Sequence, residues 1–203
     1  MRVPYGGNNV AIVSEELASE FESGDRLIVI QTTGDLLHIP SDVWDISYKT
    51  VEQAHNAFLE MGSVDDDSIT KFFKLFADYL SDEERFSAIK DSNDEDVRIA
   101  RSKGRSTTRL ILSEKMRTDM VAGLRLWENT PSQRGSAIEE INHDGWNVKL
   151  ITAGLGAVGF IFEGRPNVFA DATGVLRSGN TVVFRIGSDA LLTANAIVEH
   201  ALN

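Results

Sequence analysis

The second half of the sequence alternates between segments typical of strands and segments typical of helices, and this order constrains the fold more than any other feature. Residues 157–163 (AVGFIFE) and 181–186 (TVVFRI) favour strands, and the second strand is expected to be buried. Residues 166–176 favour a helix with Pro166 in its first turn, and a second helix is predicted over 188–202. A strand–helix–strand–helix order predicts a parallel sheet.

Capping and turn residues set the other expected boundaries in this half. Ser188 or Asp189 is expected to cap the last helix, because both side chains can accept a hydrogen bond from the first turn. Residues 147–153 (NVKLITA) are predicted to form a further strand. Residues 128–146 are polar and rich in turn-forming side chains, so they are predicted to form a connection.

The segment before this connection has the apolar period of helices. An aromatic and aliphatic stripe at i, i+3, i+4, i+7 and i+11 predicts core packing on one helix; its members are Ile69, Phe72, Phe73, Phe76 and Leu80. Ser81-Asp82-Glu83-Glu84 matches a capping box and predicts the start of the next helix, with a break near Ser92-Asn93. Residues 110–127 form another amphipathic segment.

The first residues differ in character from the rest of the chain. Strands are predicted at 9–14, 26–31 and 36–39, with a short helix at 15–22 and a turn at Gly34. We therefore predict three parts: a small α/β appendage, a helical N-terminal segment, and the first part of a nucleotide-binding α/β domain. Their expected ranges are 1–50, 51–146 and 147–203.

Composition excludes several classes of function. The chain has no cysteine, which excludes disulfides and thiolate metal sites within it, and no metal site is predicted. The net charge is −11, which argues against nucleic-acid binding. No apolar run approaches the ~18 residues of a membrane span. The first residues of the chain lack the apolar region of a signal peptide. A cytoplasmic location is therefore expected.

The charge is unevenly distributed. Residues 1–100 hold 21 acidic and 8 basic side chains, whereas residues 101–203 hold 10 acidic and 12 basic side chains. The acidic half is interpreted as a solvated surface. The second half, with its arginines, can receive a small phosphorylated anion.

Residues 154–159 (GLGAVG) match the dinucleotide pattern G-x-G-x-x-G. That pattern requires the glycines to lie between a strand and a helix, so that the helix N-terminus faces the pyrophosphate. Here Phe160-Ile161-Phe162 comes next and favours a strand. The glycines are therefore interpreted as a place where backbones pack closely.

The segment 162–168 (FEGRPNV) is more informative, because it ends a predicted strand and opens a predicted helix. Ligands of open α/β sheets bind at the carboxyl edge of the strands. Asn167 in the first helical turn can donate to a developing negative charge, although an asparagine there can also be a plain helix cap. Arg165 can hold a carboxylate or a phosphate through two parallel hydrogen bonds.

Residues 156–168 (GAVGFIFEGRPNV) are similar to G-V-I-G-V-I-Y-E-A-R-P-N-V of the γ-glutamyl phosphate reductases. Residues 176–190 (LRSGNTVVFRIGSDA) resemble L-K-S-G-N-A-V-I-L-R-G-G-S-E-A of the same family, and 94–100 (DEDVRIA) resembles N-A-x-D-V-x-x-A. The resemblance is dense over 153–203, thin over 67–152 and absent before about residue 60.

The resemblance implies an aldehyde-dehydrogenase-like fold and a reaction. The family reduces L-glutamyl 5-phosphate to glutamate 5-semialdehyde with NADPH and releases phosphate, in proline biosynthesis. Asn167 is implied as the catalytic oxyanion donor, and Glu163 and Arg165 as substrate-binding residues. The implied NADP(H)-binding residues are Arg185, Gly187, Ser188 and Asp189. The resemblance also implies a homo-oligomer when the enzyme is complete and an acyl phosphate as its small-molecule partner. The charge and the apolar pattern described above predict no nucleic-acid or membrane partner.

The family attacks the acyl phosphate with a cysteine thiolate, and this residue is implied to lie beyond residue 203. The chain is thus expected to be the N-terminal part of a longer enzyme and to be inactive alone. Ile186 replaces a glycine in the implied cofactor loop, and Gly164 and Phe169 replace alanine and threonine beside the implied anion site. Two alternatives stay open: a non-catalytic module that binds nucleotide or protein, and a related acyl-phosphate or aldehyde dehydrogenase.

Overall fold

The computed structural model describes residues 1–202 and divides the chain into two compact units, Met1–Gln53 and Ala54–Asn203. The first unit contains two antiparallel hairpins, β1 (Arg2–Tyr5) with β2 (Asn9–Ile12) and β3 (Arg26–Val29) with β4 (Leu36–Ile39). The helix α1 (Glu15–Glu20) comes after β2 and has Ser14 as its N-cap. Strand β1 was not predicted, because its four residues carry no clear alternation.

The helix α2 (Ser41–Met61) begins at Ser41 rather than at Val51. Asp25 explains the earlier start, because its carboxylate accepts a hydrogen bond from the backbone N–H of Ser41 at 2.8 Å. It also contacts the His38 ring at 2.7 Å. One acceptor for this helix start therefore comes from a side chain sixteen residues away.

The second unit is built on three helices, α3 (Asp66–Ser81), α4 (Glu83–Ser102) and α5 (Glu114–Asn129). The predicted stripe on α3 is confirmed: four of its members, Ile69, Phe73, Phe76 and Leu80, are buried, and Phe72 is partly buried against the same cluster. Burying each such side chain stabilises the fold by about 1.5–3 kcal/mol relative to leaving it exposed.

The predicted start of α4 is correct, but its cap is wrong by one residue. Ser81 ends α3, and Asp82 caps α4 by accepting from the N–H of Arg85 at 2.9 Å. The predicted break near Ser92-Asn93 is also wrong, because α4 runs through it. Asn93 is fully buried, and its amide is satisfied by partners outside the helix.

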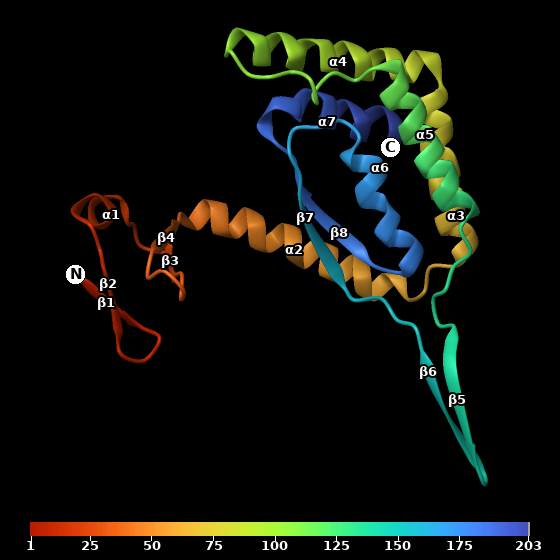
Figure 1. Cartoon of the computed structure of the whole chain (residues 1–203), viewed down its shortest axis with the longest axis horizontal. Coiled ribbons are helices and arrows are strands. Elements are labelled where there is room, and N and C mark those ends of the chain that lie inside the picture. The colour runs from red at the N-terminus through yellow and green to blue at the C-terminus, as the bar shows by residue number, and fades with distance from the viewer. Residues whose placement is uncertain (203) are drawn as a thin grey trace. The chain divides into compact units, whose positions relative to one another are not determined.

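The predicted parallel unit is confirmed. Strand β7 (Ala157–Ile161) pairs in parallel with β8 (Thr181–Arg185), and Ala157 lies opposite Thr181. Between them, α6 (Val168–Thr173) continues as a 3₁₀ turn over Gly174–Ser178, so the helix expected over 166–176 is shorter and tighter than predicted. Figure 1 shows α6 and α7 beside this strand pair.

The last helix is composite. A 3₁₀ turn, Ser188–Ala190, leads into α7 (Leu191–Ile197), and a π-helical turn, Val198–Leu202, comes after it. The predicted cap is wrong, because neither the 3₁₀ turn nor α7 has a side-chain cap from its own flanking residue. The first turn of α7 is satisfied from α4.

The prediction of a connection over 128–146 is wrong. Strands β5 (Ala137–His143) and β6 (Trp146–Ile151) form an antiparallel hairpin, and every residue of both strands is exposed. Figure 1 shows this hairpin extending from the helices of its unit. Asp144-Gly145 is a two-residue turn with Gly145 at φ 82°, which is a hairpin signal. Residues 147–153 therefore do not join the parallel pair.

The glycine interpretation is confirmed at Gly154. A Cβ there would lie 2.5 Å from the carbonyl oxygen of Gly179, so the two backbones approach too closely for a side chain. Strand β7, not a helix, comes after the glycines.

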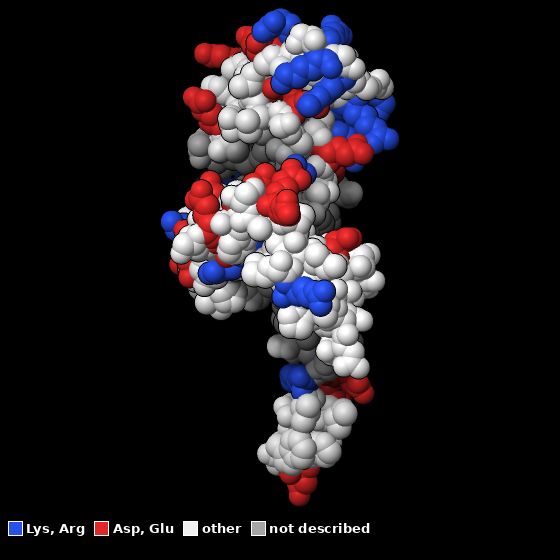
Figure 2. All heavy atoms as spheres, turned by 90° about the vertical axis from the view of Figure 1, so that its left-hand side faces the viewer, with Lys and Arg blue, Asp and Glu red and all other residues white. Residues whose placement is uncertain are grey.

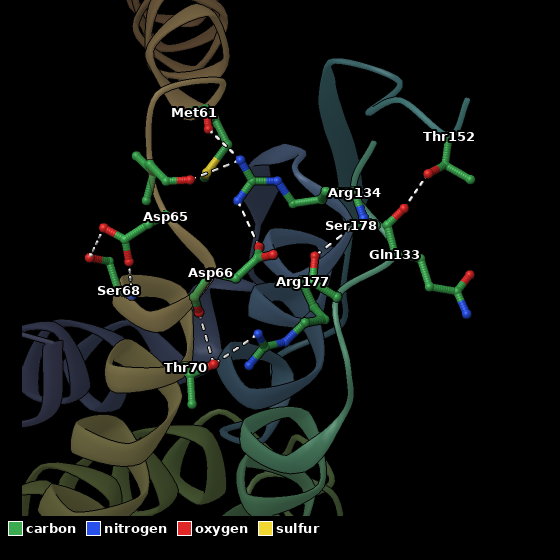
Figure 3. Close-up of polar contacts among 12 residues, drawn as sticks. Met61, Asp65, Asp66, Ser68, Thr70, Gln133, Arg134, Thr152, Arg177 and Ser178 are labelled. Atoms are coloured by element: carbon green, nitrogen blue, oxygen red, sulfur yellow. Dashed lines mark hydrogen bonds and ion pairs between the residues drawn. The ribbon is translucent and has the colours of Figure 1, made fainter. Parts of the chain in front are cut away.

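Two arginines fix connections of the second unit (Figure 3). Arg134 donates to the carbonyl oxygens of Met61 and Val64 at 2.8 and 2.9 Å and pairs with Asp66 at 3.1 Å. Arg177 donates to Thr70 Oγ1 at 3.0 Å and to the carbonyl oxygen of Trp127. The base of the hairpin and the end of the 3₁₀ turn are thereby attached to the helices.

Candidate functional site

The loops after β7 and β8 lie against each other at the carboxyl edge of the parallel pair. The N–H of Phe162 donates to the carbonyl oxygen of Arg185 at 2.9 Å. Beyond this bond, a Cβ on Gly187 would lie 2.7 Å from the backbone nitrogen of Gly164, which only a glycine permits. All seven residues implied for substrate, catalysis and cofactor therefore lie on two loops that the fold brings together.

Glu163 and Arg165 are linked electrostatically. Arg109, on the segment between α4 and α5, donates to Glu163 Oε2 at 2.5 Å, and Arg165 Nε lies 3.9 Å from the same oxygen. The hydrogen bond from Arg109 is the main cause that lowers the pKa of Glu163, and its charge and that of Arg165 add to it. Glu163 is therefore held ionised at this edge.

Asn167 lies at the N-cap of α6 but does not cap it with its side chain. Its Nδ2 donates to Asp171 Oδ2 at 3.0 Å, and its Oδ1 is buried with no hydrogen-bond partner among the described residues. A plain capping role would require Oδ1 to accept from a helix N–H. The amide is instead oriented by Asp171, one turn further along α6.

Asn167 and Asp171 line a cavity of about 320 Å³ between α5 and α6. Its other walls come mostly from α5: Ser113, Lys115, Met116, Asp119, Met120, Gly123, Trp127 and Ala170. Such a volume is at the lower end of the range for small-molecule sites. Although Asp171 is exposed to the cavity, nearby protein displaces enough water to raise its pKa, an effect that Arg165 opposes.

The implied cofactor residues differ in their environments. Arg185 and Ser188 are exposed at the end of β8, where a guanidinium and a hydroxyl are accessible to a ligand. Asp189 pairs with Arg105. Gly187 provides the close approach of the two loops.

A patch of exposed basic residues borders this edge, at the end of α4 and in the segment after it. Figure 2 shows Lys and Arg gathered at the height of α4. We call this the basic patch; it consists of Arg98, Arg101, Lys103, Arg105 and Arg109. Arg105 and Arg109 connect the patch to the loops after β8 and β7.

A buried polar network holds the loop between β8 and α7 in place. Asp96 of α4 accepts from Thr193 N–H at 2.8 Å, Thr193 Oγ1 at 2.7 Å and Leu192 N–H at 3.3 Å. Asn93 Nδ2 donates to Thr193 Oγ1 at 3.2 Å and to the carbonyl oxygen of Leu110 at 2.9 Å. The start of α7 is thus capped from another helix, which fixes the loop that precedes it.

Two expectations about substituted positions need correction. Phe169 does not lie beside the cavity; it is buried and packs edge-on against Phe184 at 4.9 Å between ring centroids. Ile186 is partly buried against the core rather than narrowing a ligand site. A Cβ on Gly164 would make ordinary contacts at 3.5 Å, so the alanine of the family would fit. These three substitutions leave the cavity unchanged.

The sequence did not point to Asp171, Arg105 or Arg109. Asp171 carries a usable signal, because an acid four positions after Asn167 shares its helix face. The two arginines reach partners 84 and 54 residues away, so no local pattern indicates them.

The fold and the site define a mixed α/β protein of short sheets and flanking helices, whose candidate site residues lie at the carboxyl edge of a parallel strand pair. The fold class expected from the resemblance is confirmed by solved structures. The crystal structure of γ-glutamyl phosphate reductase from Thermotoga maritima matches 76% of this chain and 38% of that chain, with a TM-score of 0.69 and 29% identity. The crystal structure of γ-glutamyl phosphate reductase from Saccharomyces cerevisiae matches 75% of this chain and 40% of that chain, with a TM-score of 0.69 and 21% identity.

Curated relatives agree with these structures. The γ-glutamyl phosphate reductase of Moorella thermoacetica is 37% identical over 120 residues, which are 57% of this chain and 29% of the relative. The γ-glutamyl phosphate reductase of Pelodictyon phaeoclathratiforme is 30% identical over 153 residues, which are 74% of this chain and 36% of the relative. No family model matches the chain. The chain is similar to part of a γ-glutamyl phosphate reductase and spans about a third of the length of these curated relatives.

Two absences within residues 1–202 bear on other classes of site. None of the helices there combines the length and the apolar character that crossing a membrane requires. Within the same residues, no three His, Cys, Asp or Glu side chains are grouped so that they could hold a metal ion.

Proposed function

We propose that this chain forms part of an enzyme that reduces L-glutamyl 5-phosphate to glutamate 5-semialdehyde with NADPH and releases phosphate, in proline biosynthesis in the cytoplasm. The observation that carries this proposal is the position of Asn167. Its side chain lies in the wall of a cavity at the start of α6, and its amide is oriented by Asp171 rather than used as a helix cap.

Asn167 acts as an oxyanion donor in this proposal. One N–H of its amide is engaged by Asp171. The second N–H is left to donate to the acyl oxygen, which becomes negative when a nucleophile adds to the carbonyl carbon. A donor that is already oriented costs no reorganisation, and one such donor lowers a barrier by about 3 kcal/mol. The attacking thiolate must come from outside these residues, because the chain contains no cysteine.

The residues after β8 fit a phosphorylated dinucleotide. Arg185 and Ser188 expose a guanidinium and a hydroxyl, the donor types that hold a ribose phosphate. Three residues of the basic patch, Arg98, Arg105 and Arg109, are paired with acids. Arg101 and Lys103 contribute the remaining positive charge, which favours an anionic ligand. Bound NADPH supplies the hydride. Arg185, Gly187, Ser188 and Asp189 would hold its adenosine end.

We propose further that the completed enzyme is a homo-oligomer that pairs through the β5–β6 hairpin. The register places Ile141 opposite Val148 and His143 opposite Trp146, so these residues share a face, whereas Glu140 and Lys149 share the other. Ile141, Val148 and Trp146 are 49%, 48% and 59% exposed. A two-stranded hairpin is marginally stable alone, and a second copy would cover its apolar face.

Replacing the amide tests the function. In the enzyme completed by its cysteine-bearing part, Asn167→Ala should lower the rate of acylation by about 10²–10³-fold, because the oxyanion loses one donor. The dissociation constant for NADPH should stay within about twofold, since Asn167 lies on the other loop. Stopped-flow measurement of phosphate release and titration with NADPH report these two quantities. An unchanged acylation rate would remove Asn167 from the mechanism.

A further inference from the structure

The cavity between α5 and α6 has a mixed lining. The α5 side contributes the apolar side chains of Met116, Met120 and Trp127 and a lysine–aspartate ion pair, and the α6 side contributes Asn167 and Asp171. An entirely apolar ligand would leave these two polar side chains facing it without partners, which is unfavourable. A ligand with an apolar stem and adjacent polar groups fits this division.

Asp171 differs from the other acids near the cavity. Asp119, at the cavity mouth, pairs with Lys115 at 2.5 Å, and both are largely exposed. Within the described part of the chain, Asp171 makes no ion pair within 4 Å, and its contact is the neutral amide of Asn167. Arg165 is the cation whose charge reaches it. The cavity thus presents a carboxylate whose charge is not neutralised by direct contact.

We propose that Asp171 binds the α-ammonium group of the substrate, which makes this cavity selective for a γ-acyl amino acid over the same acyl group without an amine. This inference rests on the proposed function and names the part of its substrate that the cavity recognises. An ammonium group offers three donors and a positive charge, and both compensate a partly desolvated carboxylate.

The geometry suits a substrate that carries both groups. Asn167 Nδ2 and Asp171 Oδ2 are 3.0 Å apart, so a carbonyl oxygen at one and an ammonium at the other lie at neighbouring points of the same wall. A chain of three carbons separates these groups in a γ-glutamyl compound and can curve along the apolar wall of α5. A single ligand can therefore occupy both positions.

A purely positioning role of Asp171 predicts a different result. If Asp171 only oriented Asn167, its loss would weaken every acyl ligand equally, whether or not the ligand carries an amine. Selectivity between two ligands that differ only in the amine separates the two roles. The stable probes are L-glutamate 5-methyl ester and its analogue without the amine, monomethyl glutarate.

The experiment titrates the 203-residue chain with each probe at pH 8 and follows the side-chain amide signals by NMR. The wild-type protein should bind the amino ester at least tenfold more tightly than monomethyl glutarate. Asp171→Asn, which keeps the shape of the side chain, should reduce this ratio to less than threefold by weakening the amino ester alone. Asp119→Asn is the matched control, because it removes the same charge from the cavity mouth, and it should leave the ratio unchanged.

Several outcomes would overturn the inference. These are no binding of the amino ester, equal affinity for both probes in the wild-type chain, an equal loss for both probes in Asp171→Asn, and a collapse of the ratio in Asp119→Asn. Failure of the proposed function is recognised separately, by NADPH titration of the completed enzyme. Amine-dependent binding without NADPH binding would leave the subsite standing and remove the reductase assignment.

Discussion

Replacing Asp96 is the sharpest test of how the loop between β8 and α7 is held in place. Asp96→Ala removes the acceptor of three hydrogen bonds at 2.7, 2.8 and 3.3 Å, and Thr193, the main donor, is fully buried. Loss of a helix cap costs about 1 kcal/mol. A buried donor left without a partner costs about 1–3 kcal/mol more. We therefore expect a total loss near 3 kcal/mol, or a fall in Tm of about 6–12 °C for a chain of this size.

Urea unfolding followed by circular dichroism at 222 nm measures this loss. Asp94→Ala is the control on the same helix, because Asp94 is 62% exposed and pairs with Lys90 at the surface. Its loss should cost no more than about 0.5 kcal/mol. Asp96→Asn should lie between the two, since its amide oxygen can still accept from Thr193. A loss below about 1 kcal/mol in Asp96→Ala, or equal losses in Asp94→Ala and Asp96→Ala, would refute the claim that α4 caps α7.

Three further predictions concern Asp171, Gly174 and the hairpin. Because the pKa of Asp171 is raised in the folded chain, its contribution to stability is present below its ordinary pKa and is lost as pH rises through the folded pKa. Asn167 donates to it, the charge of Arg165 acts on it, and Lys115 and Asp119 line the same cavity. Wild type should lose stability relative to Asp171→Asn across that pH range, and parallel urea curves at each pH would contradict this. Gly174→Ala should cost about 1–3 kcal/mol, because a Cβ would lie 2.6 Å from the Trp127 ring. Gly123→Ala should stabilise α5 by about 0.5–1 kcal/mol, because the space around Gly123 is open. Thermal melts of both variants show whether each change lowers or raises Tm. Trp146→Ser should reduce self-association in sedimentation velocity, and Asn147→Ser, on the polar face, should not; equal behaviour would exclude the apolar face as the interface.

The parallel pair could be predicted because its strands carry a strong local preference. Residues 181–184 are β-branched and aromatic, which favours a strand. The stripe on α3 was equally clear, since a helical period sustained over several turns is typical of a helix and of little else. In both cases the local sequence and the tertiary structure favour the same element.

The hairpin and the helix boundaries could not be predicted in the same way. Every residue of β5 and β6 is exposed, so burial leaves no strong signal, and the one clear mark, Asp144-Gly145, was interpreted as part of a connection. Two starts, those of α2 and α7, depend on Asp25 and Asp96, acceptors that lie outside the local segment. Nothing in the sequence around these two acids marks them as acceptors for a distant helix start.

The site shows the same division between local and long-range information. The order of residues on the loop after β7 predicted that Asn167 would lie where a strand gives way to a helix, and it does. The partners that give this loop its chemistry come from elsewhere: Arg109 holds Glu163, and α5 supplies the opposite wall of the cavity. A motif can therefore place a side chain on a loop, but it does not indicate which distant side chains that loop meets.

The helix α6 joins these two kinds of information because its faces have separate tasks. Val168, Phe169 and Ala172 are buried and attach a helix of six residues to the core, although so short a helix would not be stable alone. Asn167 and Asp171, four positions apart, point to the cavity. The packing of Phe169 against Phe184 holds the helix by its buried face, and the contact of Asn167 with Asp171 lies on the other face. So short a helix can present this polar pair to the cavity only because its buried face is attached to the core.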